Sequence, residues 1–466
     1  YEIANGDWSS DVCSSDLLSF RRIQNSKFLI LFPCVYASFV VPLQQIKNSI
    51  TMRKLFLTLI AVLTITSFSM AQPQYFRGAW LSTVANIDWP SKDAIGNAKL
   101  QRHEMIQILD QLQSMNFNTV IFQIRPTADA LYPSKLEPWS HWLTGKQGQD
   151  NDESYDPLAF VIEQAKMRNM DVHVWLNPYR VTLAGQKIED VAENHLYRQR
   201  PEMFWKYNGQ WYFEPGLDET RQWLCDVIKD IILRYDVQGV HMDDYFYPYP
   251  KAGEEIPDSA CFAKFPRGFD NIEDWRRNNV DMAIKDIAGV IERYKPNVQF
   301  GISPFGIWRN KKNDPRGSET DGLENYDALY ADVLLWMKNG WIDYVVPQLY
   351  WEIGKKVADY EILAHWWAEN CYSTRVYIGM SPSRMRDLSK MTPEQIKKAK
   401  LDPENPWNKG NEICKQLRLN RSIPKIQGEC FFSLKRGLFT NTKGLCDSLK
   451  TTFYKDYVDA PGKFVE

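Results

Sequence analysis

The 466-residue chain lacks an excess of either charge, since 56 Lys and Arg residues stand against 58 Asp and Glu residues. A near-neutral chain presents no broad basic field, which argues against nucleic acid as a partner. It also lacks a CxxC pair, which disfavours a zinc site or a thioredoxin-like motif. The cysteines beyond residue 71 could form one or two disulfides or remain buried free thiols; they are Cys225, Cys261, Cys371, Cys414, Cys430 and Cys446.

The chain also lacks an apolar run of the ~20 residues that a bilayer span needs. A shorter apolar run, residues 55–68, follows Arg53 and Lys54 and ends before the small residues Ser69 and Ala71. This layout is typical of a secretory signal peptide that starts at Met52 and is cleaved after Ala71. We therefore expect an exported protein, periplasmic or extracellular, without a stable membrane span after cleavage. A genuine N-terminal extension with an internal membrane helix is the alternative.

Four segments follow from this interpretation. Residues 1–51 are a leader that resembles translated upstream DNA, and residues 52–71 are the signal peptide. Residues 72–454 form the main domain, and residues 455–466 are a C-terminal tail that ends at a possible truncation. Aromatic residues make up 14% of the chain, with 17 Trp, which fits either a large core or a sugar-binding cleft.

From residue 77 onward, short apolar runs rich in Val, Ile, Phe and Tyr alternate with longer segments of helical period. The runs cover residues 78–84, 119–126, 171–180, 239–246, 299–308, 342–351, 375–384 and 426–434. The helical segments cover residues 99–115, 157–169, 219–235, 272–294, 326–339, 359–370, 412–420 and 445–454. Eight strand–helix pairs predict an α/β fold, the (β/α)₈ TIM barrel with long strand-to-helix loops. A doubly wound open sheet is the alternative.

The barrel prediction locates the site, because active sites of this fold lie at the carboxyl ends of the strands. Polar residues close the predicted strands at these ends. They are Gln123, Arg125, Asn177, Arg180, Asp243, Asp244, Ser303, Gln348, Glu352, Ser381 and Arg384. The loops after the third, fourth and fifth strands are long and carry most of the Trp and Tyr, so we expect the cleft over the third to sixth strands.

The stretch "GVHMDDYFYPYP", residues 239–250, carries two adjacent carboxylates. Side chains alternate along a strand, so His241, Asp243 and Tyr245 share one face while Val240, Met242 and Asp244 share the other. The apolar pair should face the outer helices. Asp243 is then expected to point into the barrel mouth, and Asp244 to orient a loop. The same alternation on the sixth strand aims Glu352 over the mouth.

Two carboxylates among aromatic and amide side chains are what glycosidic cleavage requires. Glu352 lies beside Tyr350 and Trp351, and rings raise the pKa of a nearby carboxyl, so we predict it as the general acid. Asp243, near His241 and Arg125, is predicted to stay ionised as the nucleophile. The alternatives are a turn or N-cap role for the aspartate and a solvated loop position for Glu352. No metal or cofactor is expected.

Other residues are predicted to bind substrate. Tyr245, Tyr247 and Trp308 lie on loops and are expected to stack on sugar rings. Trp80, Trp175, His173 and His241 lie inside strands and are interpreted as core residues, and Arg125 is open to a structural ion pair instead of a substrate contact. The full set of expected substrate-binding residues is Arg125, Asn177, Arg180, Asp244, Tyr245, Tyr247, Ser303, Trp308, Gln348 and Tyr350.

Six motifs in order resemble the glycosyl-hydrolase-like family ten proteins of bacterial envelopes. They are "RGAWLSTVANIDWP", "FQIRPTADALYPS", "LNPYR", "HMDDYFYPYP", "GISPFGIWRN" and "PQLYWEIG". The resemblance implies a TIM-barrel glycosidase, and in some members a preference for peptide-free glycan strands of peptidoglycan. It implies that Asp243 is the strand-four acid and that Arg125, Asn177, Tyr245 and Gln348 contact substrate. Many such proteins are lipoproteins and continue into a small C-terminal β-domain, and neither feature is evident here.

Two other classes of protein compete with a glycosidase. A metal-dependent barrel hydrolase would carry an HxH pair on the first strand, but "GAWLSTV" has none. A catalytically inactive carbohydrate-binding barrel needs the same rings without both acids. The expected partner in either carbohydrate case is a polysaccharide or glycan strand. The pattern leaves open the sugar, the linkage, the stereochemical outcome and the oligomeric state.

Overall fold

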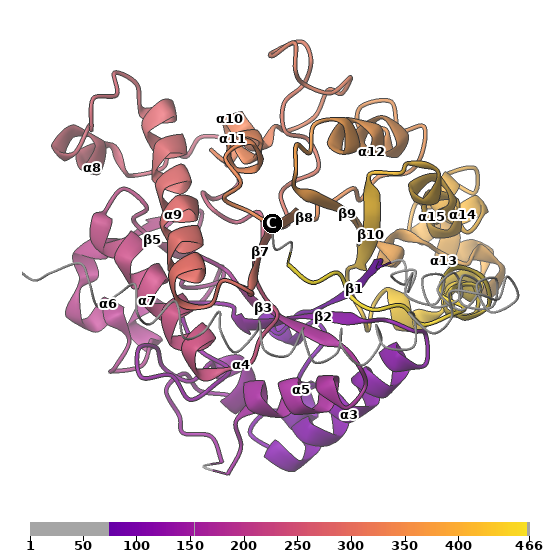
Figure 1. Ribbon diagram of the computed structural model, residues 1–466, viewed down its shortest axis with the longest axis horizontal. Coiled ribbons are helices and arrows are strands. Elements are labelled where there is room, and N and C mark those ends of the chain that lie inside the picture. Colours follow the sequence, from indigo (N-terminus) through magenta and orange to yellow (C-terminus); the bar gives the residue numbers. More distant parts are fainter. Residues whose placement is uncertain (1–73, 153, 464–466) are drawn as a thin grey trace, which may run out of the picture. The chain divides into compact units, whose positions relative to one another are not determined.

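The computed structural model describes residues 74–152 and 154–463, so the predicted leader and signal peptide lie outside the described residues. Eight parallel strands close into a barrel in the order β1-β10-β9-β8-β7-β6-β3-β2 (Figure 1). The strands are β1 Phe76–Leu81, β2 Thr119–Arg125, β3 Asp171–Leu176, β6 Gly239–Met242, β7 Gln299–Ile302, β8 Tyr344–Val345, β9 Arg375–Met380 and β10 Ile426–Phe431. This closed order confirms the predicted (β/α)₈ barrel and excludes a doubly wound open sheet.

Helices surround the barrel on its outer side (Figure 1). The longer ones are α3 Ala98–Gln113, α5 Pro157–Lys166, α7 Asp218–Arg234, α9 Ile272–Tyr294, α12 Tyr360–Glu369 and α15 Glu412–Ser422. Shorter ones are α4 His141–Thr144, α6 Leu196–Gln199, α8 Ser259–Lys264, α10 Asn325–Ala328, α11 Val333–Lys338, α13 Pro393–Lys398, α14 Pro406–Lys409 and α16 Leu445–Ser448. Asp156 caps the N-terminus of α5, since its side chain accepts a hydrogen bond from the Ala159 N–H, and Pro157 occupies the first turn.

The barrel has two apolar layers. The larger packs helices against the outer strand faces and contains the alternating residues Val240 and Met242 of β6. The smaller fills the barrel interior, where the rings of Phe76 and Tyr377 stack with centroids 4.1 Å apart. Trp80 and Trp175 belong to this interior layer and also line the cavity at its end, so they are core residues that border the site.

All eight barrel strands are shorter than the predicted runs, and one hairpin was not predicted. β6 ends at Met242 instead of Phe246, and β8 is confined to Tyr344–Val345. The long loop after β3 holds an antiparallel hairpin, β4 Phe204–Tyr207 and β5 Gln210–Phe213. Asn208 and Gly209, both with positive φ, form the two-residue turn between these strands.

The C-terminal tail lies against the amino ends of the strands, opposite the site. Arg77 donates to the Asp456 carbonyl over 2.7 Å, and Asn118 donates to the Val458 carbonyl over 3.1 Å. On the other side of the barrel, Gln299 donates to the Pro461 carbonyl over 3.0 Å. In Figure 1 this last, yellow segment runs across the centre of the barrel. The described part of the tail is therefore part of the folded domain.

Among the described residues, no helix is long and apolar enough to cross a membrane. Within the same ranges, no group of three or more His, Cys, Asp or Glu side chains is arranged to hold a metal ion. The six described cysteines are free thiols, and five of them are buried.

Candidate active site

A cavity of about 270 Å³ lies at the carboxyl ends of the barrel strands. It is lined by Trp80, Ser82, Val84, Ile87, Gln123, Trp175, Arg180, Asp243, Asp244, Tyr245, Tyr249, Ser303, Gln348, Tyr350 and Phe432. Asp243 and Asp244 are the two carboxylates among these described lining residues. Rings, amides and one acidic pair form a concave site of the kind that binds small polar ligands with apolar faces.

Asp243 is held in one orientation by its neighbours. The register of β3 and β6 pairs Trp175 with His241, so Asn177 and Asp243, two residues further along, come side by side. Trp175 Nε1 donates to Asp243 Oδ2 over 3.0 Å, and Asn177 Nδ2 lies 3.2 and 3.1 Å from Oδ1 and Oδ2. The Tyr245 N–H donates to Oδ1 over 3.1 Å. Both carboxylate oxygens are therefore engaged.

The charge environment of Asp243 differs from the predicted one. Burial raises its pKa, and the Arg180 guanidinium and the hydrogen bonds to the carboxylate reduce that rise without cancelling it, so the net shift is opposite to the one expected of a readily ionised nucleophile. The cation that acts on Asp243 is thus Arg180 and not Arg125. Arg180 lines the cavity, donates to the Pro126 carbonyl over 3.2 Å, and lies 5.1 Å from the centre of the Tyr245 ring.

Asp244 corrects the strand-register prediction, because it lines the same cavity as Asp243. β6 ends at Met242, so the alternation of side chains no longer holds at the next two residues. Gln348 Nε2 donates to Asp244 Oδ1 over 2.8 Å, and the Tyr249 hydroxyl donates to Oδ2. Burial, followed by the charge of Asp243, raises the pKa of Asp244 to about 6. An acidic pair with one member titrating near neutrality is suited to proton transfer.

Buried polar groups form the floor of the cavity. Trp80 Nε1 can only donate, and it lies 3.1 Å from His241 Nε2, which therefore accepts. The proton of His241 is then on Nδ1, 3.1 Å from the Tyr344 hydroxyl, while Ser303 Oγ lies 3.0 Å from Nε2. Burial lowers the pKa of His241 well below its ordinary value, so the ring is neutral. It is a satisfied core residue, as expected.

Arg125 corrects a second prediction, since its side chain is fully buried and does not line the cavity. Its guanidinium forms an ion pair with Glu137, with Nη2 2.6 Å from Oε1 and Nε 2.8 Å from Oε2. Nη1 donates to the Asn177 and Pro178 carbonyls over 2.5 and 3.1 Å. Arg125 therefore forms the structural ion pair that was the alternative to a substrate contact. Arg125 anchors the loop that presents Asn177.

Glu352 lies away from the cavity lining. Its Oε2 accepts from Trp407 Nε1 over 2.8 Å, and Lys355 Nζ lies 3.3 Å from Oε1. Burial favours the neutral form of this carboxyl, but the backbone, Trp407 and Lys355 hydrogen bonds outweigh it and lower its pKa. A general acid needs the opposite shift and contact with the cavity. The predicted acid role for Glu352 thus has no geometric support.

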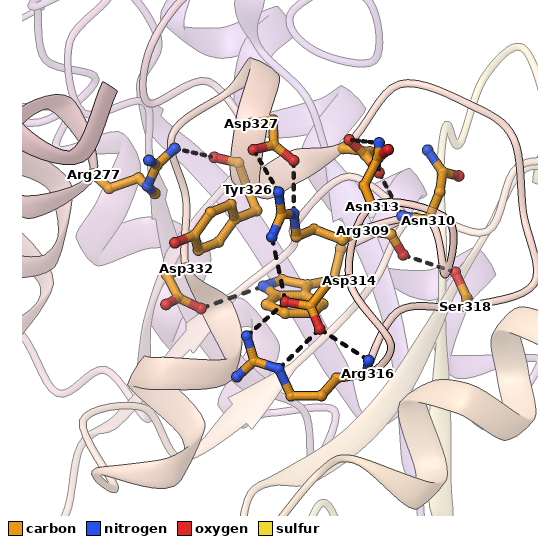
Figure 2. A network of polar contacts seen from close by, with 12 residues as sticks. Arg277, Arg309, Asn310, Asn313, Asp314, Arg316, Ser318, Tyr326, Asp327 and Asp332 are labelled. Carbon is orange, nitrogen blue, oxygen red and sulfur yellow. Dashed lines mark hydrogen bonds and ion pairs between the residues drawn. The ribbon is translucent and has the colours of Figure 1, made fainter. Parts of the chain in front are cut away.

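Tyr247 and Trp308 correct the stacking prediction, since both rings are fully buried. The Tyr247 hydroxyl accepts from Asn279 Nδ2 over 3.0 Å. The Trp308 indole donates to Asp332 over 3.3 Å and lies against the Arg316 guanidinium. Figure 2 shows the surrounding ion pairs, in which Asp314 joins Arg309 to Arg316. These rings fix loops and leave no face for a sugar.

Six of the seven remaining predicted substrate-binding residues line the cavity, and the seventh is Asn177. The six are Arg180, Asp244, Tyr245, Ser303, Gln348 and Tyr350. Of the rings, Tyr245 is 37% exposed and can present a face to a ligand. Asn177 itself acts through Asp243, to which it donates.

Eight cavity residues were missing from the predicted binding set: Trp80, Ser82, Val84, Ile87, Gln123, Trp175, Tyr249 and Phe432. Gln123 Oε1 accepts from the Thr83 and Val84 N–H groups over 2.9 Å, whereas its buried Nε2 has no partner in the described structure. A buried donor that lines a cavity without a partner is ready for a ligand oxygen. The sequence offered one indication of this role, because Gln123 lies near the carboxyl end of β2, where site residues of a barrel are expected.

The chain matches the family described as Glycosyl hydrolase-like 10 over residues 75–396. It is 44% identical over 382 residues to glycosyl hydrolase YngK of Bacillus subtilis (strain 168), covering 81% of this chain and 71% of that protein. It is 37% identical over 384 residues to glycosyl hydrolase DigH of Escherichia coli (strain K12), covering 79% of this chain and 84% of that protein. The chain therefore belongs to the Glycosyl hydrolase-like 10 family, which confirms the resemblance of its motifs.

Among solved structures, the glycoside hydrolase domain of PgaB (BpsB) from Bordetella bronchiseptica is similar to this chain with a TM-score of 0.49 and 10% identity. The match covers 81% of this chain and 98% of that one. Family membership supports a glycosidase type of function and a carbohydrate ligand.

Proposed function

We propose that this protein hydrolyses glycosidic bonds of an envelope or extracellular polysaccharide, and that peptide-free glycan strands of peptidoglycan are its first candidate substrate. The observation that carries the proposal is the Asp243–Asp244 pair inside a cavity of rings and amides. The similarity of the motifs to envelope glycosidases supports the choice of substrate.

Asp244 is the proposed general acid. Its pKa of about 6 leaves about a tenth of it protonated at pH 7 and half at pH 6, and it lines the cavity where a leaving oxygen would lie. Asp243 is the proposed anionic partner, held by donors from Trp175, Asn177 and Tyr245 for the positive charge that develops at the anomeric centre. Tyr245 supplies an exposed ring face for stacking.

We also propose that the protein is exported from the cytoplasm. The pattern of residues 52–71 supports a cleaved signal peptide, and a polysaccharide of the envelope would then be within reach.

The test is a digest of amidase-treated peptidoglycan glycan strands, with products identified by mass spectrometry. Wild-type protein should release defined oligosaccharides, and Asp243→Asn should be at least about a thousandfold slower while still binding the strands. Binding without cleavage by the wild-type protein would instead favour the carbohydrate-binding barrel. Equal cleavage by Asp243→Asn would contradict the proposed site.

A further inference from the structure

The two carboxylates of the cavity are consecutive residues on one wall. Glycosidases with two protein carboxylates place them on either side of the scissile bond, about 5–5.5 Å apart when one is a nucleophile and about 6.5–9.5 Å apart when one activates water. Asp243 and Asp244 follow β6 directly and come from the same loop. No third carboxylate lines the cavity among the described residues. Glu352, the other predicted acid, contacts Trp407 and Lys355 instead.

Asp243 is also poorly arranged to attack a sugar carbon. Oδ1 accepts from the Tyr245 N–H and Oδ2 from the Trp175 indole, and the Asn177 amide is shared between them. Donors on both oxygens withdraw electron density and hold the group in place. The same arrangement suits a fixed anion that receives a further N–H or faces a positive charge.

Building on the proposed glycosidase function, we propose that the nucleophile comes from the substrate, as the carbonyl oxygen of a 2-acetamido group on the sugar. In this arrangement Asp243 receives the amide N–H, and Asp244 is the acid and later the base. The substrate class is thereby restricted to glycans with a 2-acetamido sugar on the glycone side of the cleaved bond.

The cavity offers both parts of the environment that an acetamido group needs. Its methyl group requires apolar surface, and rings of Trp80, Trp175, Tyr350 and Phe432 line the cavity. The ring of Phe432 lies parallel to that of Tyr350 at 6.3 Å and edge-on to that of Trp80 at 6.4 Å. The amide N–H requires an anionic acceptor next to this apolar surface, and Asp243, bonded to the Trp175 indole, supplies it.

The first step forms one bond and breaks one. The amide carbonyl oxygen bonds to the anomeric carbon, and the bond from that carbon to the glycosidic oxygen breaks. The electron pair stays on the glycosidic oxygen, which takes the proton of Asp244. The product is a cyclic oxazolinium ion, whose positive charge and N–H face the Asp243 carboxylate.

The second step restores the acetamido group. A water molecule bonds to the anomeric carbon and gives its proton to Asp244, while the bond to the amide oxygen breaks and its electrons return to the amide. Two displacements at one carbon give net retention of configuration. The Tyr249 hydroxyl donates to Asp244 Oδ2 and so stabilises the carboxylate that is left when the proton has moved to the glycosidic oxygen.

The experiment uses glycan strands that differ only in the acyl group. Peptide-free strands are chemically de-N-acetylated and then re-acylated with acetyl groups, as the matched control, or with trifluoroacetyl groups. Fluorine withdraws electrons from the carbonyl oxygen and weakens it as a nucleophile. The full-length wild-type protein should cut re-acetylated strands at the original rate and trifluoroacetylated strands at least about a hundredfold more slowly at saturation.

Two further readouts separate the outcomes. Asp244→Asn protein should bind both polymers equally in calorimetry, so that the difference is one of rate. The anomer released first, observed by proton NMR, should keep the configuration of the substrate. Equal cleavage of the two polymers, or an inverted product, would overturn the acetamido mechanism and leave the glycosidase function standing. No cleavage of the original strands would overturn both.

Discussion

At the scale of single residues, the Asp243–Asp244 pair was recognisable in the sequence, but the orientation of its second member was not. Side-chain alternation predicts a face only while the backbone stays extended, and β6 ends at Met242. The roles expected of Glu352, Tyr247 and Trp308 failed for a similar reason. Proximity in sequence to rings or loops does not say whether a side chain meets solvent or packs inward.

The pH dependence of activity should report Asp244. A general acid must be protonated in the free enzyme, so kcat/KM on glycan strands should fall as pH rises through about 6, the raised pKa of Asp244. The apparent value belongs to the coupled pair of Asp243 and Asp244. The measurement is a profile of kcat/KM from pH 4 to 9, and activity that stays level to pH 9 would contradict the assignment.

The Tyr249 hydroxyl gives this prediction a matched control. Its hydrogen bond lowers the pKa of Asp244, so Tyr249→Phe should move the alkaline limb to higher pH. Tyr247→Phe removes a hydroxyl that contacts Asn279 and should leave the limb where it is. Equal shifts in the two variants would mean that the limb reports another group.

Glu352→Gln should keep activity within about twofold, a difference below roughly 0.5 kcal/mol in the activation barrier. The reason is that the Glu352 carboxylate contacts Trp407 and Lys355 and does not line the cavity. Glu352→Ala removes the acceptor of the Trp407 indole and should lower the free energy of unfolding by about 1–3 kcal/mol. Assays on glycan strands and urea unfolding check the two effects. A steep loss of turnover in Glu352→Gln with an unchanged fold would restore its predicted acid role.

At the scale of elements, the rhythm of strands and helices could be predicted because apolar periodicity follows directly from burial. The ends of the strands could not be predicted. Tyr245 and Phe246, for example, are residue types that favour strands, but β6 already ends at Met242. The predicted helix over residues 326–339 is divided into α10 and α11. The β4–β5 hairpin was missed although its turn is signalled by Asn208 and Gly209, an Asn-Gly pair with positive φ at both residues.

The C-terminal tail, residues 455–466, makes contacts with the barrel that the sequence did not predict. Arg77, Asn118 and Gln299 donate to carbonyls of residues 456–461, so deletion of residues 455–466 removes these three hydrogen bonds. The free energy of unfolding should fall by about 1–3 kcal/mol. Thermal unfolding measures the change, with deletion of residues 1–71 as the control that is expected to leave the melting temperature unaltered. A tail deletion without effect would show that these contacts add nothing to stability.

At the scale of the whole molecule, closure of the barrel brings together residues that sequence patterns treat separately. Asp244 after β6 meets Gln348 after β8, and Trp80 of β1 meets His241 of β6. A motif at the end of one strand indicates that a residue reaches the mouth of the barrel. Which partners it finds there depends on packing across the barrel, which no local pattern contains.

Buried histidines should lower the stability of the protein at low pH, and buried carboxyls should lower it at high pH. The stability should therefore be greatest at mildly acidic pH. Burial lowers the pKa of His173 to about 3, so the folded state cannot take up the proton that the unfolded state binds below about 6.5. The free energy of unfolding should therefore fall as pH drops from about 6.5 toward 3. His195, with its pKa lowered by burial to about 4, acts in the same direction.

Buried carboxyls oppose this trend at higher pH. Burial raises the pKa of Glu214 to about 8 and that of Asp281 to about 7, so the folded state holds protons that the unfolded state has released above about pH 4. The stability that these groups contribute is complete below that pH and is lost as pH rises toward 8. Melting temperatures measured from pH 3 to 9 should pass through a maximum between about 4 and 6.5, and Glu214→Gln should flatten the alkaline side. A melting temperature that rises steadily to pH 9 would contradict the assignment of these groups as buried and neutral.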